Sequence, residues 1–225
     1  MAKSRLVQKD LISNVSHELR TPVSILKAQL ENLADGIDKP TPALFEQMLD
    51  TTNQMSDLIE FFLDLSRLQE GKQFLNLSVF KIGDYLEECI SSLTYLTRAK
   101  NIQFIIDVQP ADLSIMADKN RLRQIVINLV TNAIKYSLGT SKIIIQVLQD
   151  GKNNLIRFID FGPGIPKKTR KKLFARFTRG DISQQGGTGL GLAISQWAAT
   201  LHKGKLDILD SKEGAIFELK FPKNF

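Results

Sequence analysis

The sequence predicts a chain of two parts, an all-α helical hairpin followed by an α+β sandwich with a mixed sheet on one side and helices on the other. Apolar residues recur every seven positions within residues 5–70, as in the seam of a helical bundle. Further along, short strand-like apolar runs alternate with helical ones. We expect the hairpin over residues 1–70, a linker over 71–76 and the sandwich over 77–225.

Composition places the chain among ordinary globular proteins. Its 225 residues suffice for one large or two small domains, and 43% are hydrophobic and 24% charged. No apolar run approaches the ~20 residues that span a bilayer, and no signal-peptide core follows Met1. We therefore expect a cytoplasmic product, attached to a membrane only through an upstream segment of a longer parent protein.

Charge and cysteine usage exclude several classes. The net charge of +6 is dispersed, and its densest run is Lys167–Lys172. An acidic partner or nucleotide phosphates explain that charge adequately, so we expect no nucleic-acid partner. The single cysteine, Cys89, excludes an intrachain disulfide, and two histidines without clustered carboxylates disfavour a zinc enzyme.

The helical part has two apolar registers on each of two long helices. They are Ile12, Leu19, Leu26 and Leu33 with Val23, Leu30 and Ile37, then Leu44, Leu58 and Leu65 with Met48, Met55 and Phe62. The break lies at residues 35–42, where Thr41 can cap the second helix and Pro42 enters its first turn. A single hairpin cannot bury both stripes, so we predict a homodimer that forms a four-helix bundle.

The sandwich elements follow from periodicity and turn residues. The predicted strands are 74–78, 102–108, 113–116, 143–149, 155–160, 206–209 and 215–221, and the predicted helices are 82–98, 119–137 and 189–202, with a short solvated helix at 167–172. The first glycine-rich turn is not part of a βαβ unit, and no GxxxxGK[ST] run exists, so a dinucleotide fold and a P-loop are disfavoured.

His17 lies in the string Ser16–Pro22, on a polar stripe outside the leucine seam. A neutral imidazole can attack phosphorus through one ring nitrogen, while Glu18 accepts the proton on the other nitrogen. Taken alone, an exposed histidine before a glutamate is more often a plain surface residue of a coiled coil. The string Ser16–Pro22 indicates a function only in combination with the candidate nucleotide-binding residues further along the chain.

Asn128 and Asn132 stand four apart on the predicted helix 119–137, so their amides share one face. Amide oxygens suit a hydrated Mg²⁺ that also holds triphosphate oxygens. Lys135 can neutralise phosphate charge, and Tyr136 can line the edge of a purine pocket. A pair of solvent-facing asparagines is the plain alternative.

Two glycine-rich turns complete the candidate nucleotide site. Asp160 ends a strand before Gly162 and Gly164, where its carboxylate can accept a hydrogen bond from the amine of adenine, unless it belongs to an ordinary Asp-Gly turn. The second turn precedes a helix whose start can bind phosphate. Its residues are Gly187, Thr188, Gly189, Leu190 and Gly191.

Between the turns lies a predicted mobile lid that Phe174 and Phe177 anchor. Either Arg176 or Arg179 can reach the γ-phosphate and offset charge in the transition state, although each reads equally well as a solvated arginine.

In this order, the blocks resemble the sensor histidine kinases of bacterial two-component systems, over residues 10–221. They resemble the H box (16–22), N box (128–136), G1 box (160–165), F box (174–177) and G2 box (187–192) of that family. The resemblance implies a dimeric phosphoacceptor hairpin (HisKA) and a Bergerat-type (GHKL) ATP-binding sandwich (HATPase_c). The F box departs from the family at Ala175 and Thr178, which leaves the arginine contact open.

The resemblance also implies residue roles. His17 matches the phosphoacceptor, Glu18 the adjacent acid and Thr21 the threonine used in dephosphorylating the partner regulator. Asn132 matches the Mg²⁺ ligand, with Asn128 supporting it. Lys135, Tyr136 and Asp160 match nucleotide contacts, and Asp160 is the residue that reads adenine.

The function we expect is therefore ATP- and Mg²⁺-dependent phosphorylation of His17 by a protein histidine kinase. Phosphotransfer to an aspartate in the receiver domain of a response regulator follows, together with phosphatase activity on that regulator. Two rivals remain, an ATPase or chaperone that shares the ATP fold, and a non-catalytic scaffold that binds nucleotide.

Overall fold

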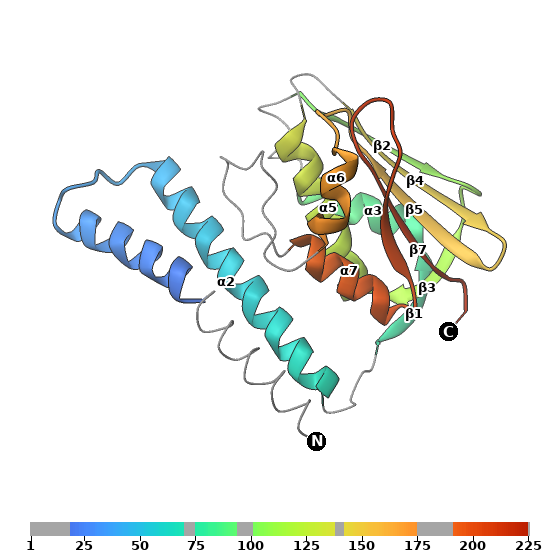
Figure 1. The fold of residues 1–225 in the computed structure, drawn as a ribbon, viewed down its shortest axis with the longest axis horizontal. Helices are drawn as coiled ribbons and strands as arrows, with labels where there is room; N and C mark the ends of the chain where they lie inside the picture. Colours follow the sequence, from blue (N-terminus) through green and yellow to red (C-terminus); the bar gives the residue numbers. More distant parts are fainter. Residues whose placement is uncertain (1–18, 70–74, 94–100, 138–141, 175–190, 225) are drawn as a thin grey trace. The chain divides into compact units, whose positions relative to one another are not determined.

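The computed structural model describes residues 19–69, 75–93, 101–137, 142–174 and 191–224. The chain divides into two compact units, residues 1–73 and residues 74–225. Figure 1 shows the helices and strands of each unit. None of the helices in the described ranges is both long enough and apolar enough to cross a lipid bilayer.

The first unit is a helical hairpin, as predicted. Its first described helix covers residues 19–34, and α2 covers Pro42–Gln69. Gly36 ends the first helix with a φ of 69°, a conformation that glycine adopts without strain. Thr41 caps α2, because its Oγ1 accepts a hydrogen bond from the Leu44 amide at 3.2 Å. These residues confirm the predicted break between the helices.

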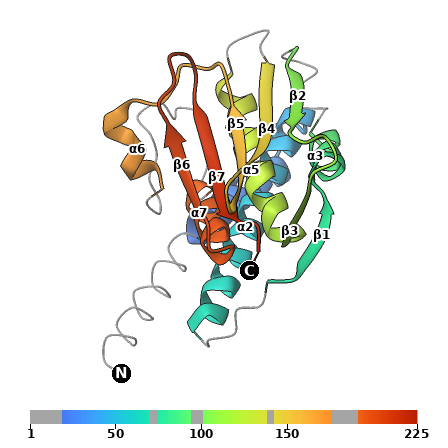
Figure 2. The ribbon, with the colours of Figure 1, turned by 90° about the vertical axis from the view of Figure 1, so that its right-hand side faces the viewer.

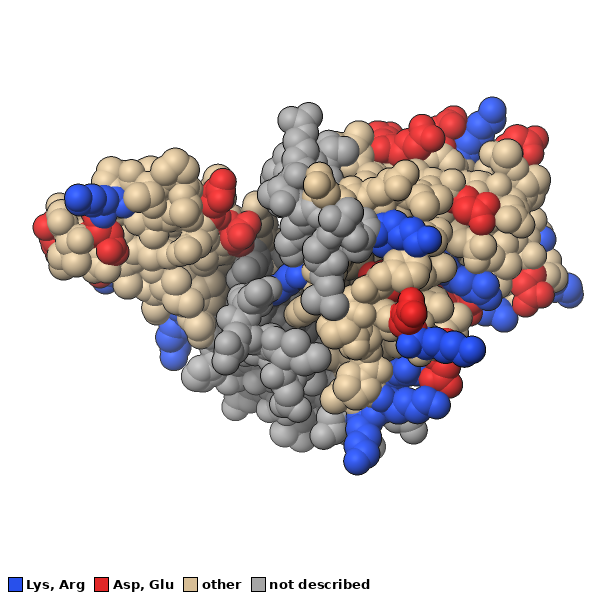
Figure 3. All heavy atoms as spheres, turned by 90° about the horizontal axis from the view of Figure 1, so that it is seen from above, with Lys and Arg blue, Asp and Glu red and all other residues tan. Residues whose placement is uncertain are grey.

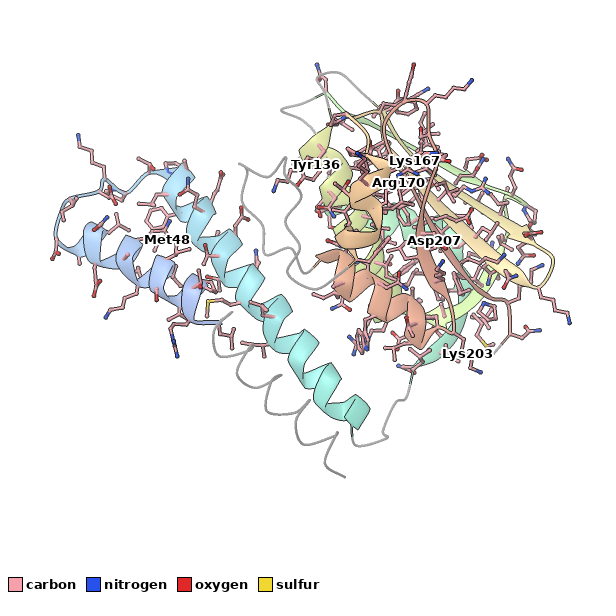
Figure 4. The ribbon with its side chains drawn as sticks, viewed as in Figure 1. Met48, Tyr136, Lys167, Arg170, Lys203 and Asp207 are labelled. Atoms are coloured by element: carbon pink, nitrogen blue, oxygen red, sulfur yellow. The ribbon has the colours of Figure 1, made fainter. Side chains whose placement is uncertain are left out.

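The apolar registers of the hairpin differ in burial. Met48 and Leu58 of α2 are buried, and Met48 lies between the two helices (Figure 4). The second register of the first helix stays open, with Val23 45%, Leu30 52% and Ile37 69% exposed. One hairpin therefore covers only part of the apolar surface that its sequence carries.

The second unit contains two sheets. The elements are β1 Leu77–Lys81, α3 Ile82–Ser91, β2 Gln103–Val108, β3 Ser114–Asp118, α5 Lys119–Tyr136, β4 Lys142–Asp150, β5 Asn153–Ile159, α6 Lys167–Leu173, α7 Gly191–Leu201, β6 Lys205–Leu209 and β7 Ile216–Pro222. Strands β1 and β3 form a two-stranded antiparallel sheet. The other five form a sheet in the order β2-β4-β5-β7-β6, in which only the β2–β4 pair is parallel.

Three features differ from the prediction. The predicted strand at 74–78 instead starts at Leu77 and continues to Lys81, because it pairs with β3, a partner that a local pattern cannot reveal. That pairing also makes a second sheet where one mixed sheet was expected. Helix α3 ends at Ser91, short of the predicted residue 98, and residues 94–100 lie outside the described part.

Helices α3, α5 and α7 cover one face of the five-stranded sheet (Figures 1 and 2). The core lies between these layers and includes Ile125 and Leu129 of α5, Ala198 of α7 and Phe158 of β5. The sheet and helices confirm the predicted α+β sandwich. Cys89 lies in this core and is fully buried, as expected for a structural cysteine.

The other face of the sheet carries two rows of side chains that cross all five strands. Strand register aligns one apolar row, Ile105, Ile144, Ile159, Ile216 and Leu209. It aligns a polar row two residues away, Asp107, Gln146, Arg157, Glu218 and Asp207. Within the polar row, the Arg157 Nε donates to Glu218 at 2.7 Å. Cross-strand pairs of this kind stabilise the register of a sheet.

His202, which ends the predicted helix 189–202, follows α7 directly and is a buried structural residue. It is 3% exposed, and its Nε2 accepts a hydrogen bond from the Asp118 amide at 3.0 Å. Its Nδ1 lies 2.8 Å from the Ala198 carbonyl oxygen, so Nδ1 carries the proton and donates it there. The imidazole thus joins the end of α7 to the junction of β3 and α5.

The buried imidazole predicts a pH dependence of stability. Burial lowers the pKa of His202 below its ordinary 6.5. Above pH 6.5, His202 is neutral in both the folded and the unfolded state. Below pH 6.5, the unfolded state binds a proton before the folded state does. The free energy of unfolding should therefore fall by up to about 1.4 kcal/mol for each pH unit by which the pH is lowered. Urea unfolding of wild type and His202→Gln at pH 7.5 and 5.5 measures this effect. If both proteins lose stability equally, His202 is not the cause.

Candidate functional site

Asp160 lies directly after β5 and is held by backbone amides. It is 8% exposed, and its Oδ1 accepts hydrogen bonds from the amides of Gly162 and Ala215, both at 3.0 Å. Its own amide donates to the Ala215 carbonyl at 3.0 Å. Burial raises the pKa of Asp160, while the two amide bonds oppose that rise. Both bonds go to one oxygen, so Oδ2 is the atom that can take a ligand.

The glycines around Asp160 are sites of close backbone approach. A Cβ on Gly162 would lie 2.6 Å from the Tyr136 carbonyl oxygen, so the first glycine turn packs directly on the end of α5. Gly164 has a φ of +74°, and a Cβ there would lie 2.9 Å from the carbonyl oxygen of Gly214. Only glycine fits both positions without a shift of backbone.

The loop between β6 and β7 is a part of this site that the sequence did not predict. Gly214 has a φ of +66°, and a Cβ on it would meet the Asp160 carbonyl oxygen at 1.9 Å. Ala215 follows, and its carbonyl accepts from the Asp160 amide while its own amide donates to the Asp160 carboxylate. A glycine directly before a predicted strand was the available signal, but it marks many ordinary turns.

Asn128 and Asn132 lie together on α5, facing the start of α7. The Asn128 Nδ2 donates to the Ser195 Oγ at 2.7 Å, and its Oδ1 lies 3.5 Å from the Asn132 Nδ2. Ser195 is fully buried on α7, so it fixes which way the Asn128 amide points. In this arrangement Asn132 turns its amide nitrogen toward Asn128, and its Oδ1 is the atom that could bind a cation.

Gly191 brings α7 close to the same amide. A Cβ on Gly191 would lie 2.0 Å from the Asn128 Oδ1. Helix α7 begins at Gly191, so its first amides lie beside the asparagine pair. A helix start next to side-chain amides is suited to phosphate oxygens.

Lys135 and Tyr136 form the last turn of α5. The Lys135 Nζ lies 5.5 Å from the centre of the Tyr136 ring, and burial lowers the pKa of Lys135. Figure 4 labels Tyr136 at this end of α5, next to the glycine turn that packs on its carbonyl. Both residues therefore lie at the edge of the Asp160 turn.

Other predicted site residues lie outside the described residues, namely His17, Glu18, Arg176, Arg179, Gly187, Thr188, Gly189 and Leu190. Thr21 is described and is exposed on the first helix. The structure therefore brings Asn128, Asn132, Gly191, Asp160 and its glycines into one unit, together with Lys135 and Tyr136.

The donors fit a nucleotide with magnesium. Amide oxygens of Asn132 and Asn128 are hard ligands, and a Mg²⁺ ion bound by few protein groups keeps water and substrate phosphates as its other ligands. Within the described ranges, no group of three or more His, Cys, Asp or Glu side chains could hold a metal ion by itself. Because the asparagine oxygens leave most of the coordination shell to other ligands, they suit a cation that arrives with its phosphates.

The surface charges show no single dominant patch on the face seen in Figure 3. Lysine and arginine side chains are interspersed there with aspartate and glutamate side chains among the described residues. Within α6, Lys167 and Arg170 are both paired with Asp210.

Comparison with known proteins identifies both units. Residues 7–71 match the His Kinase A (phospho-acceptor) domain, and residues 117–224 match the histidine kinase-, DNA gyrase B-, and HSP90-like ATPase family. The chain is 31% identical over 229 residues to the sensor-like histidine kinase SenX3 of Mycolicibacterium smegmatis, covering 99% of this chain and 59% of that protein. It therefore spans little more than half of that relative.

Solved structures of histidine kinases are also similar to this chain. The histidine kinase AdeS of Acinetobacter baumannii is similar with a TM-score of 0.75 and 28% identity, over 93% of this chain and 98% of that one. The histidine kinase ThkA, solved in complex with the response regulator protein TrrA, is similar with a TM-score of 0.73 and 25% identity, over 99% of this chain and 65% of that one. The chain belongs to the sensor histidine kinases of two-component systems, with their phosphoacceptor domain followed by their ATPase domain.

Proposed function

We propose that this chain binds ATP with Mg²⁺, transfers the γ-phosphoryl group to His17 and passes it to an aspartate of a response regulator. The observation that supports this most directly is the Asp160 carboxylate, held by two backbone amides with one oxygen left for adenine. The amine of adenine donates a hydrogen bond, whereas guanine has a carbonyl in the same place. A buried carboxylate acceptor therefore selects ATP.

The chain's own residues divide the chemistry between them. One ring nitrogen of His17 attacks the γ-phosphorus, a P–N bond forms, and the bond to the bridging oxygen breaks as ADP leaves. Glu18 takes up the proton from the other ring nitrogen. Asn132, oriented by Asn128, would hold Mg²⁺, which when bound neutralises charge on the phosphate oxygens. Arg176 or Arg179 offsets the remaining charge.

The second activity in the proposal is removal of phosphate from the regulator. Thr21 follows His17 by four positions in the sequence and is exposed in the structure. Its hydroxyl can orient a water toward a phosphoaspartate docked on this face. Decay of a phosphorylated regulator domain, compared between wild type and Thr21→Ala, measures this activity, and equal decay rates would exclude a role for Thr21.

The working form in this proposal is a homodimer in the cytoplasm, where ATP is available. Its support is the open apolar surface of the hairpin, where Ile37 is 69%, Leu49 62% and Leu30 52% exposed. A second hairpin would cover these side chains in a four-helix bundle. Light scattering of the purified chain measures the mass, and a monomer at micromolar concentration would contradict the dimer.

The test of the kinase proposal uses ATP labelled at the γ-phosphate. Wild type with Mg²⁺ should acquire label that survives base and is lost in acid, the behaviour of a phosphoramidate. His17→Gln should acquire at least about 100-fold less of this label than wild type while it still binds ATP, because the nucleophile is absent.

His202→Gln is the matched control, because the chain has only two histidines and His202 is buried. At pH 7.5 this variant should keep the label. Label retained in His17→Gln would refute the assignment of His17. Free phosphate without labelled protein would favour the ATPase rival, and bound ATP with neither product would favour the scaffold.

A further inference from the structure

Arg170 occupies an unusual position in the second unit. It lies on α6, and its side chain is 20% exposed, whereas that of its neighbour Lys167 is 78% exposed. The Arg170 Nη1 donates to the Asp210 Oδ1 at 2.6 Å, and its Nε donates to the Ile165 carbonyl at 3.1 Å. One guanidinium thus joins the end of the first glycine turn to the start of the β6–β7 loop.

The two segments that Arg170 joins also contact each other directly. At their other end, the Asp160 amide donates to the Ala215 carbonyl, and the Ala215 amide donates to the Asp160 carboxylate. Between the ends, Gly164 approaches the Gly214 carbonyl so closely that a Cβ would lie 2.9 Å away. The turn that presents Asp160 is therefore held at both ends by the same loop.

Arg170 is better suited to this task than lysine. Its planar fork donates in two directions at once, whereas an ammonium is a single compact charge. The Asp210 carboxylate is 68% exposed, so the ion pair alone contributes little in water. The shielded bond to the Ile165 carbonyl is the contact that fixes the turn. Figure 4 labels Arg170 and Lys167 together on α6.

We propose that Arg170 is a positioning residue for adenine recognition, and we name its bonds to Ile165 and Asp210 the Arg170 clamp. Together with the Asp160–Ala215 pair, the clamp stops the turn of residues 160–165 from opening. Asp160 then keeps its acceptor oxygen aimed at the base. This inference rests on the proposed ATP site and adds to it a determinant outside the pocket.

The test compares three variants with one control. Arg170→Met keeps the aliphatic length and removes both bonds, Arg170→Lys keeps the charge but not the fork, and Asp210→Asn weakens the ion pair. Lys167→Met is the control, because Lys167 bonds to Asp210 at 3.1 Å and its described contacts include none with the turn. The first readout is hydrogen exchange of the peptide that spans residues 160–166, which requires no ligand.

The second readout is the affinity for ATP and for GTP by calorimetry. Arg170→Met and Arg170→Lys should speed exchange of this peptide and weaken ATP binding about 3- to 10-fold, with a smaller loss for GTP. Asp210→Asn should show an intermediate effect, and Lys167→Met should stay within about 2-fold of wild type.

The outcomes separate the clamp from the proposed function. Unchanged exchange of residues 160–166 in both Arg170 variants would overturn the clamp. Faster exchange with unchanged ATP affinity would also overturn it, because the turn would then not matter for adenine. If wild type itself binds no ATP, the proposed ATP site fails, and the exchange experiment still decides whether Arg170 holds the turn. If Arg170→Met does not fold, Arg170→Lys and Asp210→Asn carry the test.

Discussion

Gly214→Ala should destabilise the second unit by at least about 3 kcal/mol and abolish ATP binding. Gly214 has a φ of +66°, which costs alanine about 1–2 kcal/mol. The greater part of the loss is steric, because the new Cβ would lie 1.9 Å from the Asp160 carbonyl oxygen and 2.8 Å from the Phe161 Cα. Those are backbone atoms that the Asp160–Ala215 bonds hold in place, so relief requires the site to open.

Gly151→Ala is the matched control for this effect. Gly151 has a similar φ of +55°, but a Cβ there meets nothing within 4 Å. It should cost only the backbone strain of about 1–2 kcal/mol. Chemical unfolding of both variants can be followed by the fluorescence of Trp197, the single tryptophan, which lies in the second unit. Equal losses of unfolding free energy in the two variants would show that the close approach of the β6–β7 loop to Asp160 does not contribute to stability.

Asp160→Asn should weaken ATP binding about 10- to 100-fold, which corresponds to about 1.4–2.7 kcal/mol. The asparagine Oδ1 can still accept from the amides of Gly162 and Ala215, so the turn should survive. The atom facing the ligand becomes an NH₂ group, which meets the amine of adenine as donor against donor. The same group can donate to the carbonyl of guanine, so the preference for ATP over GTP should shrink or reverse.

Asp207→Asn serves as the control, because Asp207 lies in the polar row on the sheet face away from the helices. Calorimetric titration with ATP and GTP, alongside Trp197 unfolding, separates loss of affinity from loss of fold. A variant that binds ATP as wild type does, while remaining folded, would remove Asp160 from adenine recognition.

Local signals in the sequence were enough for most elements. Helix α5 follows its predicted bounds within one residue, because its apolar period is strong and Asp118 caps its start with a bond to the Arg121 amide. Strands β4 and β5 lie close to their predicted ranges, 143–149 and 155–160, and pair with each other in antiparallel fashion. Strand β1 differs from its predicted range, because its position depends on pairing with β3, more than thirty residues away in the chain.

The candidate site likewise depends partly on local sequence patterns and partly on contacts that form only in the folded structure. The sequence alone determined the candidate groups, His17, Asn132 and Asp160 among them, because each stands in a short pattern whose chemistry can be read from residue type and spacing. Only the tertiary structure decided what holds them, namely Ser195 against Asn128, Ala215 against Asp160 and Arg170 against Asp210. These pairs lie between 40 and 67 residues apart in the chain. No local pattern encodes such contacts, because they exist only once the sheet and the helices have packed and have brought the β6–β7 loop onto the glycine turn.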